Sequence, residues 1–326
     1  MEELLQMVFD RDGSDLHIAA NVPPIIRING KLTKTDYEPL TGEDTQRLIF
    51  SILTNEQRKQ LEQTYELDCS YGVVGLGRFR VNSFKSKGNY AAVLRTINSK
   101  APKMEDLNMP PIVNELTHKP RGMVLVTGPT GSGKSTTLAA MIDHLNTTRS
   151  LNIISLEDPI EFVHPSKRSQ VVQRELGTHI SSFADGVRDS LREDPDVILV
   201  GELRDAETIS MAMTAAETGH LVLGTLHTTS AVKSVDRIID ALPSDQREQT
   251  KSFLSHSLHA VVTQNLVKTP DGRQRRAIVE IMVMNRAIAK LITTEQTHQI
   301  PAQLLTGKSQ GMQQMDQALL DAISAK

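Results

Sequence analysis

The feature that most constrains the fold of this chain is a glycine-rich run near its middle, Gly128-Pro129-Thr130-Gly131-Ser132-Gly133-Lys134-Ser135-Thr136. The run fits the pattern G-x-x-x-x-G-K-[ST], whose glycines let the backbone turn its N–H groups onto phosphate oxygens. An apolar run over 122–127, typical of a buried strand, precedes it, and a helical pattern over 137–142 follows it. The sequence therefore predicts a strand, a phosphate-binding loop and a helix, with Lys134 contacting the β- and γ-phosphates of a nucleotide and Ser135 ligating Mg²⁺.

Composition limits the classes of protein to which this chain can belong. Its 326 residues suggest two domains. A formal net charge of −3 and an aromatic content of 3% argue against a nucleic-acid partner. The single cysteine, Cys69, excludes an internal disulfide and a multi-cysteine zinc site, and it fits a reducing cytosol. We expect no secretory signal and no integral membrane segment, because no apolar run approaches the ~18 residues that a spanning helix requires.

Residues 1–98 are predicted to form a small α+β domain. The pair Asn29-Gly30 lies between two short apolar runs and is a strong hairpin signal. Residues 44–61 have a helical pattern, whereas 77–84 alternate between apolar and polar residues, as a half-buried strand does, and 90–97 follow as a second strand. Residues 99–111 contain three prolines and little periodicity, which indicates a linker.

From residue 112 onward, short apolar runs alternate with helical patterns. The predicted strands are 122–127, 152–156, 197–200 and 221–225. Such alternation predicts an α/β fold with a parallel sheet covered by helices on both faces. From about residue 231 to the end the chain is predicted to be helical, with one hairpin-like break at 269–272.

Polar clusters follow three of these predicted strands, at the edge where ligands bind in open parallel sheets. The first cluster contains Glu157, Asp158 and Glu161. The second contains Glu202, and the third contains His227. The first cluster could hold Mg²⁺ through water or orient an attacking water, although an acidic turn before a helix gives the same pattern. Glu202 is expected to be the general base that positions water against the γ-phosphate. His227 is expected either to sense the γ-phosphate or to be an ordinary core histidine.

A pair of arginines lies on the predicted strand at 77–84. Arg78 and Arg80 are two residues apart and project from one face, while Phe79 and Val81 pack on the other. Arg95 on the neighbouring strand could join them. Transfer of a γ-phosphate usually needs a cation that neutralises developing charge, and these arginines could supply it. On the pattern alone, a solvated basic face is the simpler interpretation.

Longer stretches resemble the signatures of one known family. Residues 191–205, LREDPDVILVGELRD, are similar to the signature of the secretion and type IV pilus motor ATPases. Residues 157–161 resemble the aspartate box of that family and 218–228 its histidine box, while 14–17 and 23–30 extend the likeness towards the N-terminus. Within the family, the chain is most similar to the pilus retraction ATPases of the PilT type.

The resemblance implies a PAS-like N-terminal domain over 1–98 and a RecA-like motor domain with a C-terminal helical region over 112–326. It implies a cytoplasmic homo-hexamer, peripherally associated with the inner membrane at the pilus base, that hydrolyses ATP with Mg²⁺. Its partner would be an inner-membrane platform protein, and its task would be pilus retraction in twitching motility. The resemblance also identifies Arg78, Arg80 and Arg95 as arginine fingers and places Arg188, Arg192 and Arg204 near the catalytic interface.

One segment departs from the retraction pattern. Retraction motors carry A-I-R-N-L-I-R near the C-terminus, whereas this chain has Ala289 and Thr293 at the two arginine positions. The apolar spacing is kept, so a helix can still pack there. An accessory retraction motor is therefore an alternative. A pilus-assembly or type II secretion motor is another, although the chain lacks the four-cysteine zinc module of the assembly branch.

Two alternatives lie outside this family of motors. A nucleic-acid translocase on the same core is disfavoured by the low aromatic content and the negative net charge. A nucleotide-dependent binding module without turnover is disfavoured by the presence of both Lys134 and Glu202.

Overall fold

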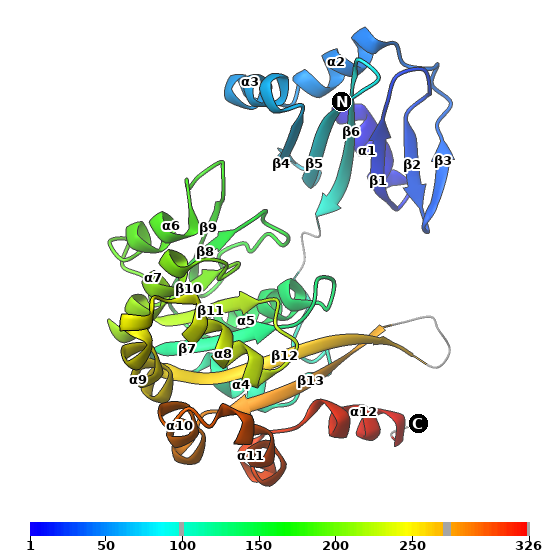
Figure 1. The fold of residues 1–326 in the computed structure, drawn as a ribbon. Helices are drawn as coiled ribbons and strands as arrows, with labels where there is room; N and C mark the ends of the chain where they lie inside the picture. The colour runs from blue at the N-terminus through cyan, green and yellow to red at the C-terminus, as the bar shows by residue number, and fades with distance from the viewer. Residues whose placement is uncertain (98–100, 270–274, 325–326) are drawn as a thin grey trace. The chain divides into compact units, whose positions relative to one another are not determined.

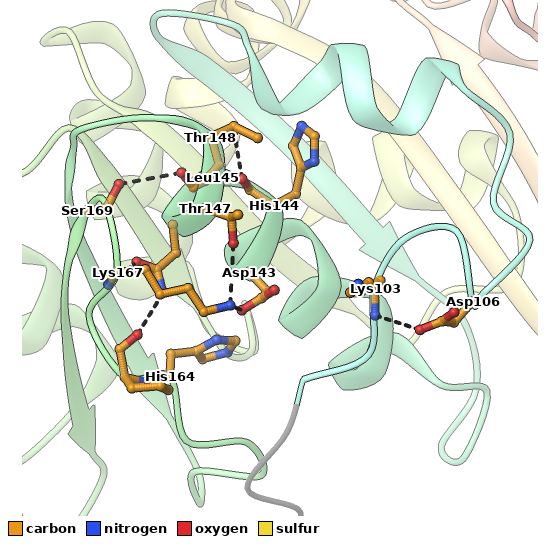
Figure 2. A network of polar contacts seen from close by, with 12 residues as sticks. Lys103, Asp106, Asp143, His144, Leu145, Thr147, Thr148, His164, Lys167 and Ser169 are labelled. Carbon is orange, nitrogen blue, oxygen red and sulfur yellow. Dashed lines mark hydrogen bonds and ion pairs between the residues drawn. The ribbon is translucent and has the colours of Figure 1, made fainter.

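The computed structural model describes residues 1–97, 101–269 and 275–324, and the chain divides into two compact units (Figure 1). One unit comprises Met1–Lys100 together with Pro159–Val163, and the other comprises Ala101–Asp158 and His164–Lys326. Residues 99 and 100 of the predicted linker, and 270–272 of the predicted hairpin-like break, lie outside the described residues. None of the helices in the described part of the chain has the length and apolar composition that a membrane crossing requires.

The N-terminal unit is built on a six-stranded antiparallel sheet, in the order β3-β2-β1-β6-β5-β4. Its elements are α1 (Glu2–Asp10), β1 (Gly13–Ile18), β2 (Ile25–Ile28), β3 (Lys31–Lys34), α2 (Gly42–Phe50), α3 (Asn55–Thr64), β4 (Glu66–Val73), β5 (Gly77–Ser86) and β6 (Asn89–Ile97). The predicted hairpin joins β2 to β3, and Asn29 and Gly30 have the positive φ angles of 49° and 81° that its two-residue turn requires. Alternation along β5 buries Phe79 and Val81 completely, as predicted.

The single helix predicted over 44–61 is wrong, because the chain forms α2 and α3 there. Between them, Ile52 and Leu53 are buried in the hydrophobic core of this unit. Thr54 then starts α3 with a capping box: its hydroxyl accepts from the N–H of Gln57, whose side chain accepts from the N–H of Thr54. The pattern T-x-x-Q is the sequence signal for the start of this second helix. The helical periodicity of 44–61 continues across it and hides the boundary between the two helices.

The second unit is built on a seven-stranded sheet, in the order β13-β12-β7-β11-β10-β8-β9. All neighbouring strands are parallel except β12 and β13, which pair antiparallel. Its elements up to β11 are α4 (Ile112–Thr117), β7 (Gly122–Thr127), α5 (Lys134–Thr148), β8 (Asn152–Glu157), β9 (Gln170–Glu175), α6 (Phe183–Ser190), β10 (Val197–Val200), α7 (Ala206–Glu217) and β11 (Leu221–Leu226). The four predicted strands are confirmed as β7, β8, β10 and β11.

Helices cover both faces of this sheet, as the alternating pattern predicted (Figure 1). Met123 and Leu125 of β7 pack in one hydrophobic cluster, which includes buried residues of α6 and α7. Val124 and Val126 pack in a second cluster on the other face, which includes buried residues of α4 and α5. Consecutive residues of a buried strand thus pack into two different hydrophobic clusters, which explains why these strands are continuously apolar in sequence.

The prediction of helices from residue 231 to the end is wrong in its middle part. After α8 (Ala231–Ala241) and α9 (Arg247–Ser257), the chain forms β12 (Leu258–Lys268) and β13 (Arg275–Val283). It then ends in α10 (Arg286–Thr293), α11 (Ile300–Thr306) and α12 (Met315–Ser324). The strand β12 lies beside β7 inside the sheet and is buried on both faces, so it lacks the alternation that marks a half-buried strand.

Candidate active site

The phosphate loop connects the end of β7 to the start of α5. Gly131 and Gly133 have φ angles of 78° and 91°, in the left-handed region that favours glycine. Gly133 is the N-cap of α5, and no side chain in the described part of the chain caps this helix. Nζ of Lys134 donates to the carbonyl oxygens of Gly128 and Pro129, at 2.9 and 3.1 Å. A glycine cradle, an uncapped helix N-terminus and an ammonium group are the combination that binds nucleotide phosphates.

A residue of β12 that the sequence analysis missed also belongs to this loop. The side chain of Gln264 is buried between the loop and α5, and only 2% of the residue is exposed. Its Nε2 donates to the carbonyl oxygen of Ser132 at 2.7 Å, and its Oε1 accepts from Oγ1 of Thr137 at 2.7 Å. The only signal in the sequence is an amide within an apolar run, and that run was assigned to a helix.

Glu202 follows β10, and its carboxylate lies between two basic side chains. Nη2 of Arg204 is 2.6 Å from Oε2, and Nε2 of His227 is 3.0 Å from Oε1. Burial opposes ionisation of this carboxyl group. The hydrogen bond and charge of Arg204, and then those of His227, outweigh the burial, so the pKa of Glu202 lies below its ordinary value. The group is therefore a carboxylate at neutral pH and accepts hydrogen bonds.

His227 connects this carboxylate to the phosphate loop. Its second ring nitrogen, Nδ1, lies 3.4 Å from Oγ1 of Thr130. The side chain is 45% exposed, so it is not a buried core histidine. His220, by contrast, lies before β11 and has Nδ1 2.9 Å from the carbonyl oxygen of Ala215. Of the two histidines, His227 alone lies with the residues at the strand ends.

Glu157 ends β8, next to the residue that precedes Glu202. A Cβ atom at Gly201 would come within 2.9 Å of the carbonyl oxygen of Leu156, so the backbones leaving β8 and β10 touch. Oε1 of Glu157 accepts hydrogen bonds from Ser155 and Gln173, at 2.7 and 2.9 Å. These contacts fix the carboxylate at the edge of the sheet.

The other two acidic residues of this cluster differ in placement. Asp158 contributes, after the larger effect of Glu202, to a raised pKa of Arg204 and thus lies near the Glu202 pair. Glu161 lies in Pro159–Val163, the segment that belongs to the N-terminal unit. The structure therefore brings Glu157 and Asp158 to the edge that holds Glu202, and it does not place Glu161 in the same unit.

A chain of hydroxyl groups, three of them on buried residues, leads to the histidine segment. Oγ1 of Thr263 on β12 is 2.8 Å from Oγ1 of Thr127, the last residue of β7. Oγ of Ser234 on α8 donates to the same Thr127 oxygen at 3.5 Å and is 2.6 Å from Oγ1 of Thr228. Because Thr228 directly follows His227, these hydroxyls join β12 and β7 to the segment that contacts Glu202.

The three candidate finger arginines lie on one face of the N-terminal sheet. Arg80 and Arg95 are directly opposite each other on β5 and β6, and Arg78 is two residues away on β5. Each one is held within its own sheet. Arg78 Nη2 donates to Ser70 at 2.6 Å, Arg80 Nε to Asp68 at 3.2 Å, and Arg95 Nε to Asp15 at 2.8 Å.

Asp15 organises this arginine face from β1. Its carboxylate is almost fully buried and lies 3.6 Å from Arg27 as well as in contact with Arg95. Burial raises the pKa of Asp15, but hydrogen bonds from Ser14 and Arg95 lower it further, so the net pKa lies below the ordinary value. A buried charge of this kind needs its partners, and it fixes the guanidinium groups on the face.

Comparison with known proteins agrees with the geometry of the site. A family model described as "Type II/IV secretion system protein" matches residues 75–324. The chain is 51% identical to the "Twitching motility protein" of Neisseria gonorrhoeae over 91% of this chain and 79% of that protein. In Pseudomonas aeruginosa it is 48% identical to the "Type IV pilus retractation ATPase PilT", over 97% and 92% of the two chains, and 40% identical to the "Type IV pilus ATPase PilU", over 98% and 83%.

A solved structure extends the likeness to three dimensions. The crystal structure of the pilus retraction motor PilT with bound ADP superposes with a TM-score of 0.92 at 44% sequence identity, over 99% of this chain and 92% of that one. The two proteins share both the parallel α/β sheet of the motor unit and the small N-terminal unit. This chain therefore belongs to the type II/IV secretion system protein family and is an ATP-hydrolysing motor of the pilus retraction type.

Proposed function

We propose that this protein hydrolyses ATP to drive retraction of a type IV pilus. The observation that carries the proposal is the contact series from Thr130 of the phosphate loop through His227 to the carboxylate of Glu202. This series puts a fixed, ionised acceptor next to the loop. The extended likeness to retraction motors then supplies the task for which hydrolysis is used.

The residues of the site divide the work of hydrolysis between them. Lys134, the loop N–H groups and the N-terminus of α5 bind the phosphates. Glu202 accepts a hydrogen bond from the attacking water and orients it towards the γ-phosphate. Arg204 and His227 keep the Glu202 carboxylate ionised and correctly placed.

Mg²⁺ would be held by Ser135 and the phosphates, with Glu157 or Asp158 contributing through water. Bound there, it would neutralise charge on the phosphates. The residues present fit this arrangement, since Ser135 lies in the first turn of α5, directly after Lys134. In the described part of the chain, no group of three or more His, Cys, Asp or Glu side chains could hold a metal by itself, so the phosphates are needed as ligands.

The arginine face of the N-terminal unit would supply the remaining positive charge. Arg78, Arg80 and Arg95 lie in a different compact unit from the loop, which suits delivery of charge to the nucleotide of a neighbouring subunit. We propose a homo-hexamer on this basis, located in the cytoplasm at the inner-membrane base of the pilus. Its partner would be the platform protein there. The PAS-like and RecA-like assignment of residues 1–98 and 112–326 belongs to the same proposal.

The function is tested with Glu202→Gln, which keeps the shape of the side chain and removes its charge. We expect phosphate release to fall by about 10²-fold or more, because a neutral amide cannot act as the acceptor base, while ADP binding stays unchanged. Glu217→Gln, at the exposed end of α7, is the matched control and should keep full activity. Unchanged turnover in Glu202→Gln would contradict the proposed mechanism.

The retraction role is tested in cells. A deletion strain should carry more surface pili and lose twitching, and the wild-type gene but not Glu202→Gln should restore movement. Loss of all surface pili would instead show an assembly motor. Stimulation of purified protein by added DNA would favour a translocase.

An accessory retraction motor is kept as the second candidate because of α10. Ile288 and Ile292 of this helix are fully buried, so the helix packs normally, while Thr293 is exposed where a retraction motor has arginine. The higher identity to PilT than to PilU favours the principal motor. If deletion leaves twitching partly intact, and Ala289→Arg with Thr293→Arg increases retraction force, the accessory role is supported.

A further inference from the structure

We propose that Gln264 is a positioning residue for the phosphate loop and that nucleotide affinity depends on its amide group. The inference rests on the proposed function, because it concerns the same nucleotide site. The strand β12 runs parallel to β7, and Thr263 is paired with Thr127, where β7 ends. From Gln264 to Lys268, β12 continues past the point where the loop begins. On the side of β12 away from β13, Gln264 is therefore the first residue beyond the pairing with β7, next to the loop.

The side-chain amide of Gln264 forms hydrogen bonds through both its nitrogen and its oxygen. Its nitrogen donates to the carbonyl oxygen of Ser132 in the loop, and its oxygen accepts from the hydroxyl of Thr137 in the first turns of α5, each at 2.7 Å. A carbonyl oxygen only accepts, so the orientation of the amide is fixed by its partners. One side chain thus joins the loop to the helix that follows it.

Two glycines of the phosphate-loop motif are shaped by contact with the same residue. A Cβ atom at Gly128 would lie 2.2 Å from the backbone carbonyl oxygen of Gln264, and one at Gly133 would lie 2.7 Å from its Nε2. At Gly131 a Cβ atom would meet nothing within 4 Å. The first and last glycines therefore let the loop close around Gln264, whereas the middle one is needed for its positive φ angle alone.

Because Gln264 is buried, losing either of these two hydrogen bonds is costly. Gln264 is 2% exposed, so an unpaired donor or acceptor at this place has no water to replace the lost partner. The loop holds three glycines at positive φ angles, and a loop that is already held in this form loses less entropy when phosphates bind. Removing the amide should weaken nucleotide binding without removing any group that touches the nucleotide.

The test measures the dissociation constant of a fluorescent ADP analogue with the full-length protein. Gln264→Met keeps the shape of the side chain but neither hydrogen bond, and we expect about 10- to 100-fold weaker binding at every pH, from the loss of buried partners. Gln264→Glu should bind weakly at alkaline pH, where two carboxylate oxygens cannot donate to Ser132. Its binding should recover on acidification, because a protonated carboxyl group has one donor and one acceptor, as the amide does.

Controls separate positioning from general damage. Asn265→Asp makes the same charge change one residue along β12, where the side chain contacts Met315 instead of the loop, and should bind ADP normally. Thr137→Val removes the other partner and should weaken binding by about 5-fold or more. Adding Thr137→Val to Gln264→Met should weaken binding little further, because both changes break the same hydrogen-bonded link between the loop and α5. Dividing each value by that of the wild type at the same pH cancels the titration of the nucleotide.

The outcomes distinguish this inference from the function on which it rests. If the wild type binds ADP and Gln264→Met and Thr137→Val bind equally well, the inference is overturned and the proposed function stands. A Gln264→Glu protein that is weak at all pH values would also overturn it, because the donor to Ser132 would then be irrelevant. If the wild type itself binds no ADP, the proposed function fails first. Should Gln264→Met not fold, Thr137→Val decides the question.

Discussion

The two sheets of this protein place their charged side chains in different ways. In the N-terminal unit, strand alternation gives an antiparallel sheet one apolar face and one face that carries arginines. In the motor unit, the parallel strands are buried on both faces, and the charged residues lie beyond the strand ends. The arginines of the first unit are paired with acceptors in their own sheet, whereas Glu202 of the second contacts Arg204 of its own segment and His227, which follows another strand.

This difference shows how each unit depends on its surroundings. The topology of a parallel sheet brings strand ends together, so the loop, Glu202 and His227 form a site within one unit. Among the described residues of the other unit, no phosphate-binding loop accompanies the arginine face. Its proposed role depends on an assembly of subunits, whereas the motor site has its geometry in a single chain. The predictions below test that contrast.

The largest effect is expected at Lys134. Lys134→Ala removes the ammonium group of the loop motif, which is expected to contact the β- and γ-phosphates. ATP turnover should fall by about 10³-fold, and ADP affinity should fall with it. Phosphate release and ADP titration measure the two effects. Retention of normal ADP binding would show that the loop does not hold the nucleotide through this residue.

A smaller effect is expected on the arginine face. Arg80→Ala should lower turnover by about 10²-fold without changing ADP affinity, since the arginine stabilises charge that develops in the transition state. Arg27→Ala is the control, because Arg27 lies next to Asp15 on the same face but is not a candidate finger.

Mixing experiments sharpen the same prediction. Subunits with Arg80→Ala and subunits with Glu202→Gln should regain part of the activity when combined, because some sites then have both groups intact. Equal loss with Arg27→Ala, or no recovery on mixing, would contradict delivery of charge between subunits. The face would then be a structural surface.

The pH dependence of turnover should move when Arg204 is replaced. In the proposed mechanism Glu202 must be ionised to accept a hydrogen bond from water, so activity is expected to fall as the pH falls through its pKa. Burial raises that pKa, and Arg204 is the first of the groups that lower it, ahead of His227. Arg204→Met should therefore shift the acid limb of the rate profile to higher pH.

His227→Gln should shift the same limb by less, because His227 contributes less than Arg204 to the lowered pKa. Rate profiles of both variants, recorded at saturating ATP, measure the two shifts. A profile that keeps its acid limb in Arg204→Met would show that Glu202 is not the titrating group.

The smallest effect concerns stability, at Glu280 on β13. Burial is the main cause of its raised pKa, although the carboxylate accepts from the N–H groups of Ala231 and Met315. The folded state therefore binds this proton more tightly than the unfolded state. The free energy of unfolding should fall as the pH rises through the interval between the ordinary and the raised pKa.

Glu280→Gln should remove the part of this pH dependence that comes from Glu280, so the free energy of unfolding of the variant should change less over that interval. Urea unfolding of the wild type and the variant at several pH values measures it. Identical pH dependence in both proteins would show that Glu280 does not titrate differently in the folded state.

The motor site could be predicted from the sequence because its residues directly follow continuous apolar runs. The loop, Glu202 and His227 were all found in this way, and their mutual contacts follow from parallel pairing of β10, β11 and β7. Gln264 could not be found, because its partners Ser132 and Thr137 are more than a hundred residues away along the chain.

The missed strands have physical causes as well. The strand β9 is at the sheet edge and carries Gln173 and Arg174, so it lacks the apolar run of its neighbours. The strand β12 is buried on both faces, and the polar residues Thr263 and Gln264 interrupt its apolar pattern. Edge position and two-sided burial both remove the alternation on which strand prediction depends.

Thr263 and Gln264 are consecutive residues of β12, so their side chains project to opposite faces of the sheet. One reaches the hydroxyls under the histidine segment, and the other reaches the phosphate loop. The strand β12, which pairs with β13 over residues 260–268, thus contacts both the phosphate loop and the hydroxyl groups under the histidine segment. A displacement of β12 would therefore be expected to move the phosphate loop and the segment that contains His227 together.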